Sequence, residues 1–162
     1  MKPNCAIYPG SFDPVHFGHL DVIARSTQLF STVIIAVAAS MAKGPFFSVE
    51  ERIEMLRESI GNNAAVKIVP LDGLLVDFAR QQEVFTVIRG LRAVSDFEFE
   101  FQMALMNRKL EPRLETVFLT PKEDYTYLSS RIVKEVARFG GDVGQFVPPS
   151  VVSRMKQAGR SF

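Results

Sequence analysis

The two histidines of this chain lie three positions apart, in a stretch suited to binding phosphate. His16 and His19 bracket Gly18 in the run GSFDPVHFGH, directly before a segment with helical periodicity. If that segment is helical, side chains three apart share a face. Free backbone N–H groups at the start of a helix favour an anion such as phosphate, and a glycine there lets a ligand approach the backbone. The spacing therefore predicts an anion site with two imidazoles beside it.

The residues of this stretch argue against two other kinds of binding site. A zinc site needs more ligands, but the chain offers no third histidine and a single cysteine, Cys5. The phosphate-binding patterns G-x-G-x-x-G and G-x-x-x-x-G-K-[ST] are both absent. A purely structural interpretation stays open. In it, Gly10 and Pro14 shape a tight turn as the chain leaves a strand, and the histidines are polar surface residues.

Three basic side chains follow other apolar runs and suit the same chemistry. Lys43 comes shortly after the second run, and Arg89 and Arg92 flank a Gly-Leu pair directly after the fourth. An arginine fork binds phosphate oxygens in pairs, so the two arginines favour an anionic ligand. The structural alternatives are a solvated lysine and surface ion pairs between the arginines and acidic residues of the next helix.

Alternating apolar runs and helical patterns indicate the scaffold that must position these residues. The predicted strands are residues 5–8, 32–39, 66–70, 85–89 and 116–119. The predicted helices are residues 18–30, 48–60, 74–82, 96–110, 129–139 and 149–158. This alternation predicts an α/β fold. We expect one doubly wound, Rossmann-like domain over residues 1–162, with a five-stranded parallel sheet and helices on both faces.

The strand order follows from where the chemistry lies. In such sheets ligands bind beyond the carboxyl ends of the strands, where the strand order reverses. The histidine loop follows the first strand and the arginine loop follows the fourth. We therefore expect these two strands to be neighbours, which gives the order 3-2-1-4-5.

The composition argues against several classes of protein. With a formal net charge of +1, no strong field favours nucleic acid or an anionic membrane. No apolar run approaches the ~20 residues of a membrane span, and the amino terminus lacks the pattern of a signal peptide. One cysteine cannot form an internal disulfide, so nothing points to secretion. We expect a cytoplasmic protein that binds neither nucleic acid nor membrane.

Two motifs, in order, resemble the signatures of the nucleotidylyltransferase superfamily. HFGH at residues 16–19 is similar to the first signature, (H/T)-x-G-H. LSSRIVK at residues 128–134 is similar to the second and begins a late helix. The segment IRGLRAVSDFEFE at residues 88–100 resembles the phosphopantetheine adenylyltransferase family in particular.

This resemblance implies an activity and its partners. Members of that family transfer AMP from ATP to 4′-phosphopantetheine and form dephospho-coenzyme A and pyrophosphate, with Mg²⁺ carried by ATP rather than by a metal site of the protein. Coenzyme A as feedback inhibitor and a homohexamer, built as a dimer of trimers, are implied in the same way. Two alternatives stay open. One is a nicotinate mononucleotide adenylyltransferase, which GSFDPVHFGH also resembles. The other is an inactive nucleotide-binding regulatory module.

The resemblance also implies site residues. The catalytic set is Ser11, His19, Lys43 and Arg92. In it, His19 donates a hydrogen bond to the α-phosphate in the transition state. ATP would contact Ser11, Phe12, His19, Gly90, Leu91, Arg92, Glu100, Tyr125, Thr126, Tyr127, Leu128, Ser129, Ser130 and Arg131. The phosphopantetheine would contact Ser11, Lys43, Leu75, Arg89 and Asn107.

Some of these residues have a structural alternative or depart from the family pattern. Glu100 suits the ribose or base of ATP, or else is an exposed helical carboxylate. Leu75 lines the pantetheine arm or packs in the core, and Ser129 caps a helix as well as facing phosphate. His16 stands where the family more often has threonine, and Arg131 replaces a hydroxyl residue.

Overall fold

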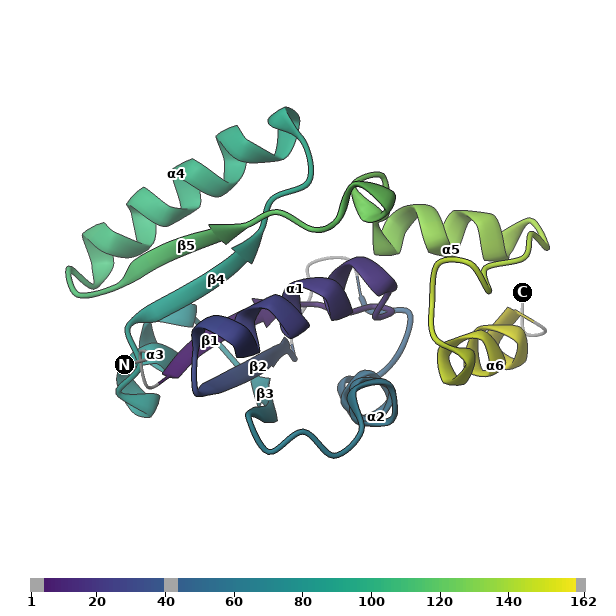
Figure 1. Ribbon diagram of the computed structural model, residues 1–162, viewed down its shortest axis with the longest axis horizontal. Helices are drawn as coiled ribbons and strands as arrows, with labels where there is room; N and C mark the ends of the chain where they lie inside the picture. Colours follow the sequence, from purple (N-terminus) through teal and green to yellow (C-terminus); the bar gives the residue numbers. More distant parts are fainter. Residues whose placement is uncertain (1–4, 40–43, 160–162) are drawn as a thin grey trace.

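Five parallel strands form one sheet in the order β3-β2-β1-β4-β5, which confirms the expected order (Figure 1). The computed structural model describes residues 5–39 and 44–159. The strands are β1 Cys5–Gly10, β2 Thr32–Ala38, β3 Val66–Leu71, β4 Thr86–Gly90 and β5 Glu115–Leu119.

Helices cover both faces of this sheet, so two apolar cores form. The helices are α1 Phe17–Leu29, α2 Val49–Ile60, α3 Leu75–Gln82, α4 Val94–Leu110, the short η1 Glu123–Tyr125, α5 Ser130–Arg138 and α6 Pro149–Ala158. Val33, Ile35 and Val37 of β2 enter the core shared with α1, α2 and α6. Ile34 and Ala36 point the other way, into the core shared with α3. A strand buried on both faces has to be apolar throughout, as this one is.

Local signals place the helix ends close to where the sequence predicted them. Ser48 caps α2: its Oγ accepts the N–H of Glu51 at 3.1 Å, and the Glu51 carboxylate accepts the N–H of Ser48 at 2.8 Å. This is the reciprocal box that the Ser-x-x-Glu spacing predicts.

Within residues 5–39 and 44–159, no helix combines the length and the apolar character needed to cross a membrane.

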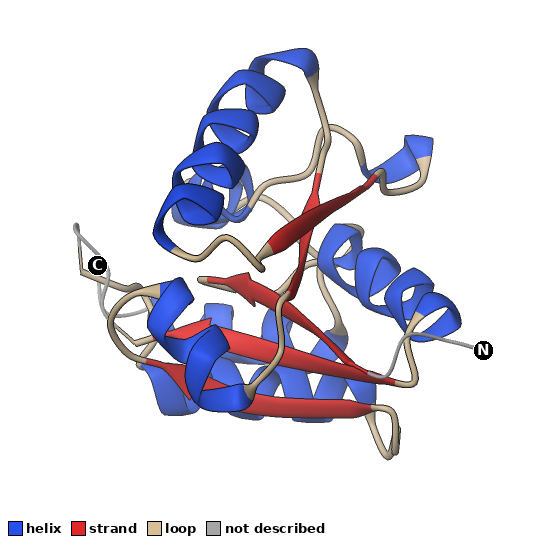
Figure 2. Cartoon of the chain, turned by 90° about the vertical axis from the view of Figure 1, so that its left-hand side faces the viewer, coloured by secondary structure: helices blue, strands red, loops and turns tan. Residues whose placement is uncertain are grey.

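The sheet is weakly joined between β1 and β4, where the strand order reverses. β1 pairs with β2 from its first residue to its last, but it pairs with β4 only at Ile7–Val87. In Figure 2 the two upper strands, β4 and β5, run steeply across the other three. The carboxyl ends of β1 and β4 therefore diverge and leave room for a ligand at the point where this class of fold binds one.

Candidate active site

A pocket of about 430 Å³ lies beyond the carboxyl ends of β1 and β4. Its walls come from the loop after β1, the start of α1, the loop after β4 and the start of α5. The predicted site residues that line it are Ser11, Phe12, His19, Arg89, Gly90, Arg92, Glu100, Ser129 and Ser130. The amino ends of α1 and α5 both border this pocket, and the positive end of each helix dipole favours an anion there.

The two histidines form a reciprocal cap at the start of α1. Nδ1 of His16 accepts the backbone N–H of His19 at 3.3 Å, and Nδ1 of His19 accepts the backbone N–H of His16 at 3.2 Å. The two rings stack with their centroids 3.7 Å apart. Two imidazoles thus perform the work that serine and glutamate perform in an ordinary capping box. The interpretation of both as surface residues is wrong for His16, which is buried.

Burial keeps both imidazole rings neutral. Desolvation and the Arg92 cation lower the pKa of His16 to about 3. Desolvation, together with His16 and the arginines Arg92 and Arg89, lowers the pKa of His19 well below its ordinary value. Because each Nδ1 accepts a backbone N–H, the single ring proton lies on Nε2. His19 therefore brings a neutral Nε2–H donor to the pocket wall.

Lowered histidine pKa values make the stability of the protein depend on pH. Below pH 6.5 the two histidines become protonated in the unfolded chain but stay neutral in the folded protein. The free energy of unfolding should therefore fall as the pH drops from 6.5 toward 5. The slope should approach about 1.4 kcal/mol per pH unit for each histidine. Urea unfolding at pH 7.5, 6.5, 5.75 and 5.0 measures it.

A threonine at position 16 provides the control for this slope. His16→Thr keeps an N-cap oxygen but removes one titrating ring, so about half of the pH dependence should disappear while the helix cap survives. Equal slopes in the two proteins would mean that His16 is protonated in the folded state. Ring ¹⁵N shifts of the two histidines, which are the only ones in the chain, report the Nε2–H tautomer directly.

Two glycines of the first loop, Gly10 and Gly18, line the pocket and also lie against rings of neighbouring residues. Gly10 is the last residue of β1, and the residue with left-handed backbone geometry is Phe12, at a φ of 49°. A Cβ added at Gly10 would lie 3.0 Å from the Phe12 ring, and one added at Gly18 would lie 3.0 Å from the His16 ring. A side chain at either glycine would therefore press on a ring of the protein, and the approach of a ligand to the backbone of Gly18 stays a prediction.

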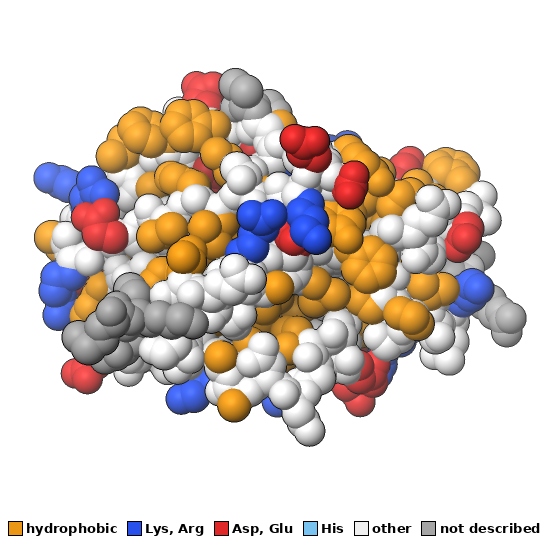
Figure 3. Space-filling model, viewed as in Figure 1, with side chains coloured by type: hydrophobic (Ala, Val, Ile, Leu, Met, Phe, Trp, Pro, Cys, Tyr) orange, Lys and Arg blue, Asp and Glu red, His pale blue; other side chains and the backbone are white. Residues whose placement is uncertain are grey.

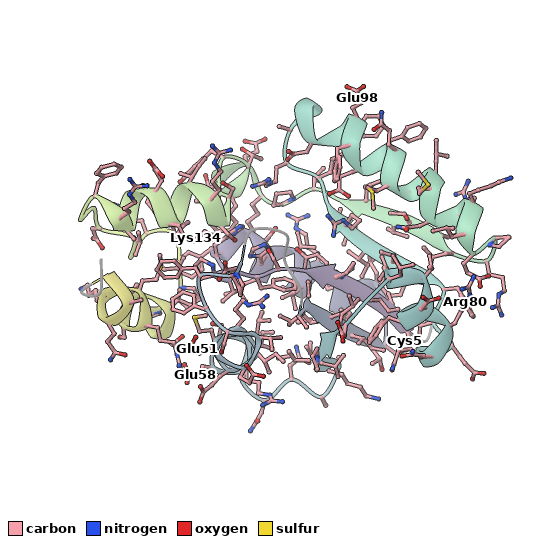
Figure 4. The ribbon with its side chains drawn as sticks, turned by 180° about the vertical axis from the view of Figure 1, so that it is seen from behind. Cys5, Glu51, Glu58, Arg80, Glu98 and Lys134 are labelled. Atoms are coloured by element: carbon pink, nitrogen blue, oxygen red, sulfur yellow. The ribbon has the colours of Figure 1, made fainter. Side chains whose placement is uncertain are left out.

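Asp13 ties the first loop to two distant segments, and the sequence interpretation missed it. Its carboxylate is 1% exposed and accepts the N–H groups of Phe46 at 2.8 Å and Phe47 at 2.9 Å. Lys134 reaches it from α5, with Nζ 3.2 Å from Oδ2 (Figure 4). A single carboxylate before a proline, between the apolar residues Phe12 and Val15, was the available signal.

Arg89 is held by Glu100 on the pocket wall. Its Nε and Nη2 donate to the two carboxylate oxygens at 2.7 and 2.6 Å, and its Nη1 donates to the carbonyl of Pro9 at 3.0 Å. The Glu100 side chain is 11% exposed, so it is not the exposed helical carboxylate that the sequence left open. A contact between Glu100 and ATP stays a prediction.

Arg92 joins the arginine loop to the second motif. Its Nη1 donates to the carbonyl of Leu128, and its Nε lies 3.3 Å from the carboxylate of Asp96. Ser129 caps α5 by accepting the N–H of Ile132 at 3.1 Å, as predicted. The Oγ of Ser130 donates to the carbonyl of Pro14 at 2.8 Å. The second motif is therefore in direct contact with the arginine loop and with the loop that precedes the first motif.

Other predicted ATP contacts lie outside the walls of this pocket. They are Leu91, Tyr125, Thr126, Tyr127, Leu128 and Arg131. The N–H of Leu91 continues the β4–β5 pairing by donating to Leu119 at 2.9 Å. Tyr127 is 60% exposed. The segment from Tyr125 to Arg131 covers the end of η1, the connection at residues 126–129 and the start of α5. Lys43 falls outside the residues that the structure describes.

A smaller pocket of about 100 Å³ adjoins the first, and Arg89, Phe99 and Glu100 line both. It holds the two remaining predicted contacts, Leu75 from α3 and Asn107 from α4. Glu100 and Asn107 thus share one face of α4, as their spacing of seven predicts. Arg89 and Glu100 therefore lie at the boundary between the wider pocket and the smaller one, whose walls are partly apolar and partly polar.

Comparison with known proteins agrees with this geometry. The cytidylyltransferase-like family model matches residues 7–136. A phosphopantetheine adenylyltransferase of Nitrosomonas eutropha is 54% identical, over 93% of this chain and 92% of that protein. One from Azoarcus sp. strain BH72 is 52% identical over 97% of this chain and 96% of its own. This chain belongs to the phosphopantetheine adenylyltransferase family.

Solved structures of low identity confirm the fold of this family member. A nicotinic acid mononucleotide adenylyltransferase of Plasmodium falciparum, complexed with NaAD, superposes with a TM-score of 0.71 at 13% identity. The superposition covers 96% of this chain and 95% of that one. At this identity the likeness concerns the Rossmann-like fold and not the acceptor.

Proposed function

We propose that this chain transfers AMP from Mg-ATP to 4′-phosphopantetheine. A phosphate oxygen of the acceptor attacks the α-phosphorus of ATP, the bond from that phosphorus to the bridging oxygen breaks, and pyrophosphate leaves with dephospho-coenzyme A as the other product. One observation carries the proposal: His19, two arginines and two helix amino ends surround a single pocket. The family of the full-length relatives supports the choice of acceptor.

In this reaction the protein has to position charged groups and stabilise the transition state. No side chain needs to act as a nucleophile, because the acceptor brings its own oxygen. The Nε2–H of His19 donates to the α-phosphate as negative charge spreads over its oxygens, and Arg92 adds a fixed positive charge on the same wall. Because His19 is neutral before substrate binds, it needs no proton from solvent to act as a donor.

We place the acceptor on the Arg89 side of the pocket. The apolar Leu75 and the amide of Asn107 suit a chain that alternates methylene and amide groups, and Arg89 suits its phosphate. Lys43 and Ser11 remain proposed contacts from the family resemblance. ATP would take the wider side, toward Ser129, Ser130 and the segment up to Arg131.

Mg²⁺ enters this proposal as part of the ATP substrate. The carboxylates on the wide pocket, Asp96 and Glu100, are each paired with an arginine. Among the described residues no cluster of three His, Cys, Asp or Glu side chains could hold a metal ion. The residues present therefore suit a cation that stays on the nucleotide phosphates, and we assign no step to it.

Variants of Arg89 and Glu100 should show whether Arg89 binds the acceptor in addition to stabilising the fold. Arg89→Met should raise the KM for 4′-phosphopantetheine by about 10- to 100-fold, because a charged hydrogen-bonding group is lost. It should also lower the melting temperature, since Glu100 is left unpaired. The second change Glu100→Gln should restore the melting temperature but not the KM. Recovery of the KM in the double variant would show that Arg89 acts only as a partner of Glu100.

A homohexamer, feedback by coenzyme A and a cytoplasmic location complete the proposal. α4 exposes seven large apolar side chains, each between 41% and 62% accessible: Phe97, Phe99, Phe101, Met103, Leu105, Met106 and Leu110. Figure 3 shows apolar surface over α4 at its upper left. Exposed apolar side chains of this number on one helix suit burial against another copy of the chain. Analytical ultracentrifugation tests the assembly, and competition of coenzyme A with 4′-phosphopantetheine tests the feedback.

Pyrophosphate release from Mg-ATP tests the proposed function. The two acceptors, 4′-phosphopantetheine and nicotinate mononucleotide, are offered separately, and we expect release with the first alone. Release with the mononucleotide alone would favour the alternative activity. No pyrophosphate release with either acceptor, together with measurable ATP binding, would favour a non-catalytic nucleotide-binding module.

A further inference from the structure

Arg52 is a fully buried arginine that lies behind the first loop. It extends from α2, it is 0% exposed, and the hydrogen bonds that it makes within the described residues go to backbone carbonyls. Nη1 donates to Ser11 at 2.7 Å and to Ala38 at 2.8 Å. Nε donates to Phe47 at 3.0 Å and to Ser48 at 3.3 Å. One guanidinium thus joins the loop after β1, the end of β2 and the start of α2.

The carbonyl of Ser11 is the point where this guanidinium reaches the active site. The next residue, Phe12, has a φ of 49°, which is unfavourable for a bulky side chain and persists only where the surroundings impose it. The Phe12 ring is buried and packs edge-on against His19, with ring centroids 4.9 Å apart. A hydrogen bond that fixes the peptide before Phe12 therefore also fixes the ring behind His19.

The same part of the backbone is held from the other side by Asp13. Its carboxylate accepts the N–H of Phe47, whose carbonyl accepts from Arg52. The first loop and the start of α2 are therefore joined by two polar groups that both contact Phe47. Neither group touches the pocket, because Arg52 and Asp13 are absent from its lining.

Stability alone does not account for an arginine at this position. Nη2 is buried and has no hydrogen-bond partner among the described residues. Leaving a charged donor unpaired is unfavourable, and an apolar side chain of similar volume avoids that loss. Polar groups kept in a core at such a disadvantage are expected at sites where geometry matters for function.

We propose that Arg52 is a positioning residue for the adenylyl transfer: it holds the Ser11 carbonyl so that Phe12 supports His19 in its catalytic position. This inference rests on the proposed function for its kinetic test, but its structural part concerns the His19 ring alone. Lysine can reach one or two of these carbonyls but lacks the planar fork that spans four of them.

Kinetics of Arg52→Lys and Arg52→Met test the proposal, with Arg57→Met as the control. Arg57 is exposed on the same helix. Arg52→Met should lower kcat by about 10- to 100-fold, with Arg52→Lys between it and the unchanged protein, because misplacing a catalytic group by about 1 Å has an effect of that size. The Kd for ATP should change by less than about threefold, since the other ATP-side residues are untouched. Arg57→Met should leave both constants unchanged.

The NMR resonances of the histidine rings test the positioning role of Arg52 independently of the proposed activity. In Arg52→Lys the His19 ring shifts should move while those of the Arg57→Met control stay in place, whether or not the protein turns over any acceptor. Unchanged His19 shifts, or an unchanged kcat in Arg52→Lys, would overturn the positioning role. Failure of both Arg52 variants to fold would also overturn it, because the arginine would then serve the fold. An unaltered protein that releases no pyrophosphate contradicts the proposed function alone.

Discussion

Replacing His19 with alanine should lower kcat by about 10²- to 10³-fold, which is the effect of removing one preorganised donor to a developing negative charge. The affinity for ATP should change far less, because the donor acts on charge that develops only in the transition state. Steady-state pyrophosphate release gives kcat, and calorimetric titration gives the Kd for ATP. A weakened Kd with an intact kcat would remove His19 from the chemical step.

A second variant at position 19 separates the catalytic role from the cap. The His19 ring also accepts the His16 N–H, so alanine removes half of the reciprocal box and should reduce stability by about 1 kcal/mol. Glutamine at this third helical position suits a capping box. His19→Gln should therefore keep more of the melting temperature than His19→Ala while kcat stays low. If kcat follows the melting temperature in the two variants, the cap rather than the donor explains the loss.

Replacing Asp13 with alanine should reduce the free energy of unfolding by about 3–5 kcal/mol. The carboxylate is buried, and alanine removes the charged acceptor of two backbone N–H groups, those of Phe46 and Phe47. The loss of two hydrogen bonds to a charged group has an effect of that size, whereas Lys134, whose side chain is 31% exposed, adds little because water can solvate it. Urea unfolding measures the change as a lower midpoint at constant slope.

Two further variants show whether burial is the cause. Asp77 makes an ion pair with Arg80 but is 55% exposed, so Asp77→Ala should alter stability by less than about 1 kcal/mol. Asp13→Asn keeps the shape of the side chain and one good acceptor. Its loss of unfolding free energy should therefore lie between those of Asp13→Ala and Asp77→Ala. Equal losses for Asp13→Ala and Asp77→Ala would contradict the buried network.

The fold could be predicted because its signals are local and agree with one another. The run at 32–38, which is rich in β-branched residues, is apolar on both of its faces, and the structure buries both. The Ser48–Glu51 spacing marks the start of a helix by a contact within a single turn. Predicting the strand order required one further assumption, that the two loops with phosphate-binding residues follow neighbouring strands.

The candidate site could be predicted as a set of loops but not as a set of contacts. The residue types around His19, Arg89 and Ser130 indicated phosphate chemistry, and the structure brings them to one pocket. Whether Glu100 contacts ATP or is an exposed carboxylate was left open by its helical spacing. Its bidentate pair with Arg89 depends on how α4 lies over β4, which no local pattern records.

By itself, the amino-acid sequence determined the strand and helix pattern, the sheet order, the family and the loops that carry the chemistry. Those properties depend on neighbouring residues and on residue type. Only the tertiary structure decided that Arg52 is buried beneath Ser11, and that Asp13 joins segments more than thirty positions apart. The physical reason is that burial changes what a polar group does. Arg52 and the exposed Arg57 stand on the same helix and look alike in the sequence, and only the packing of α2 against the first loop separates them.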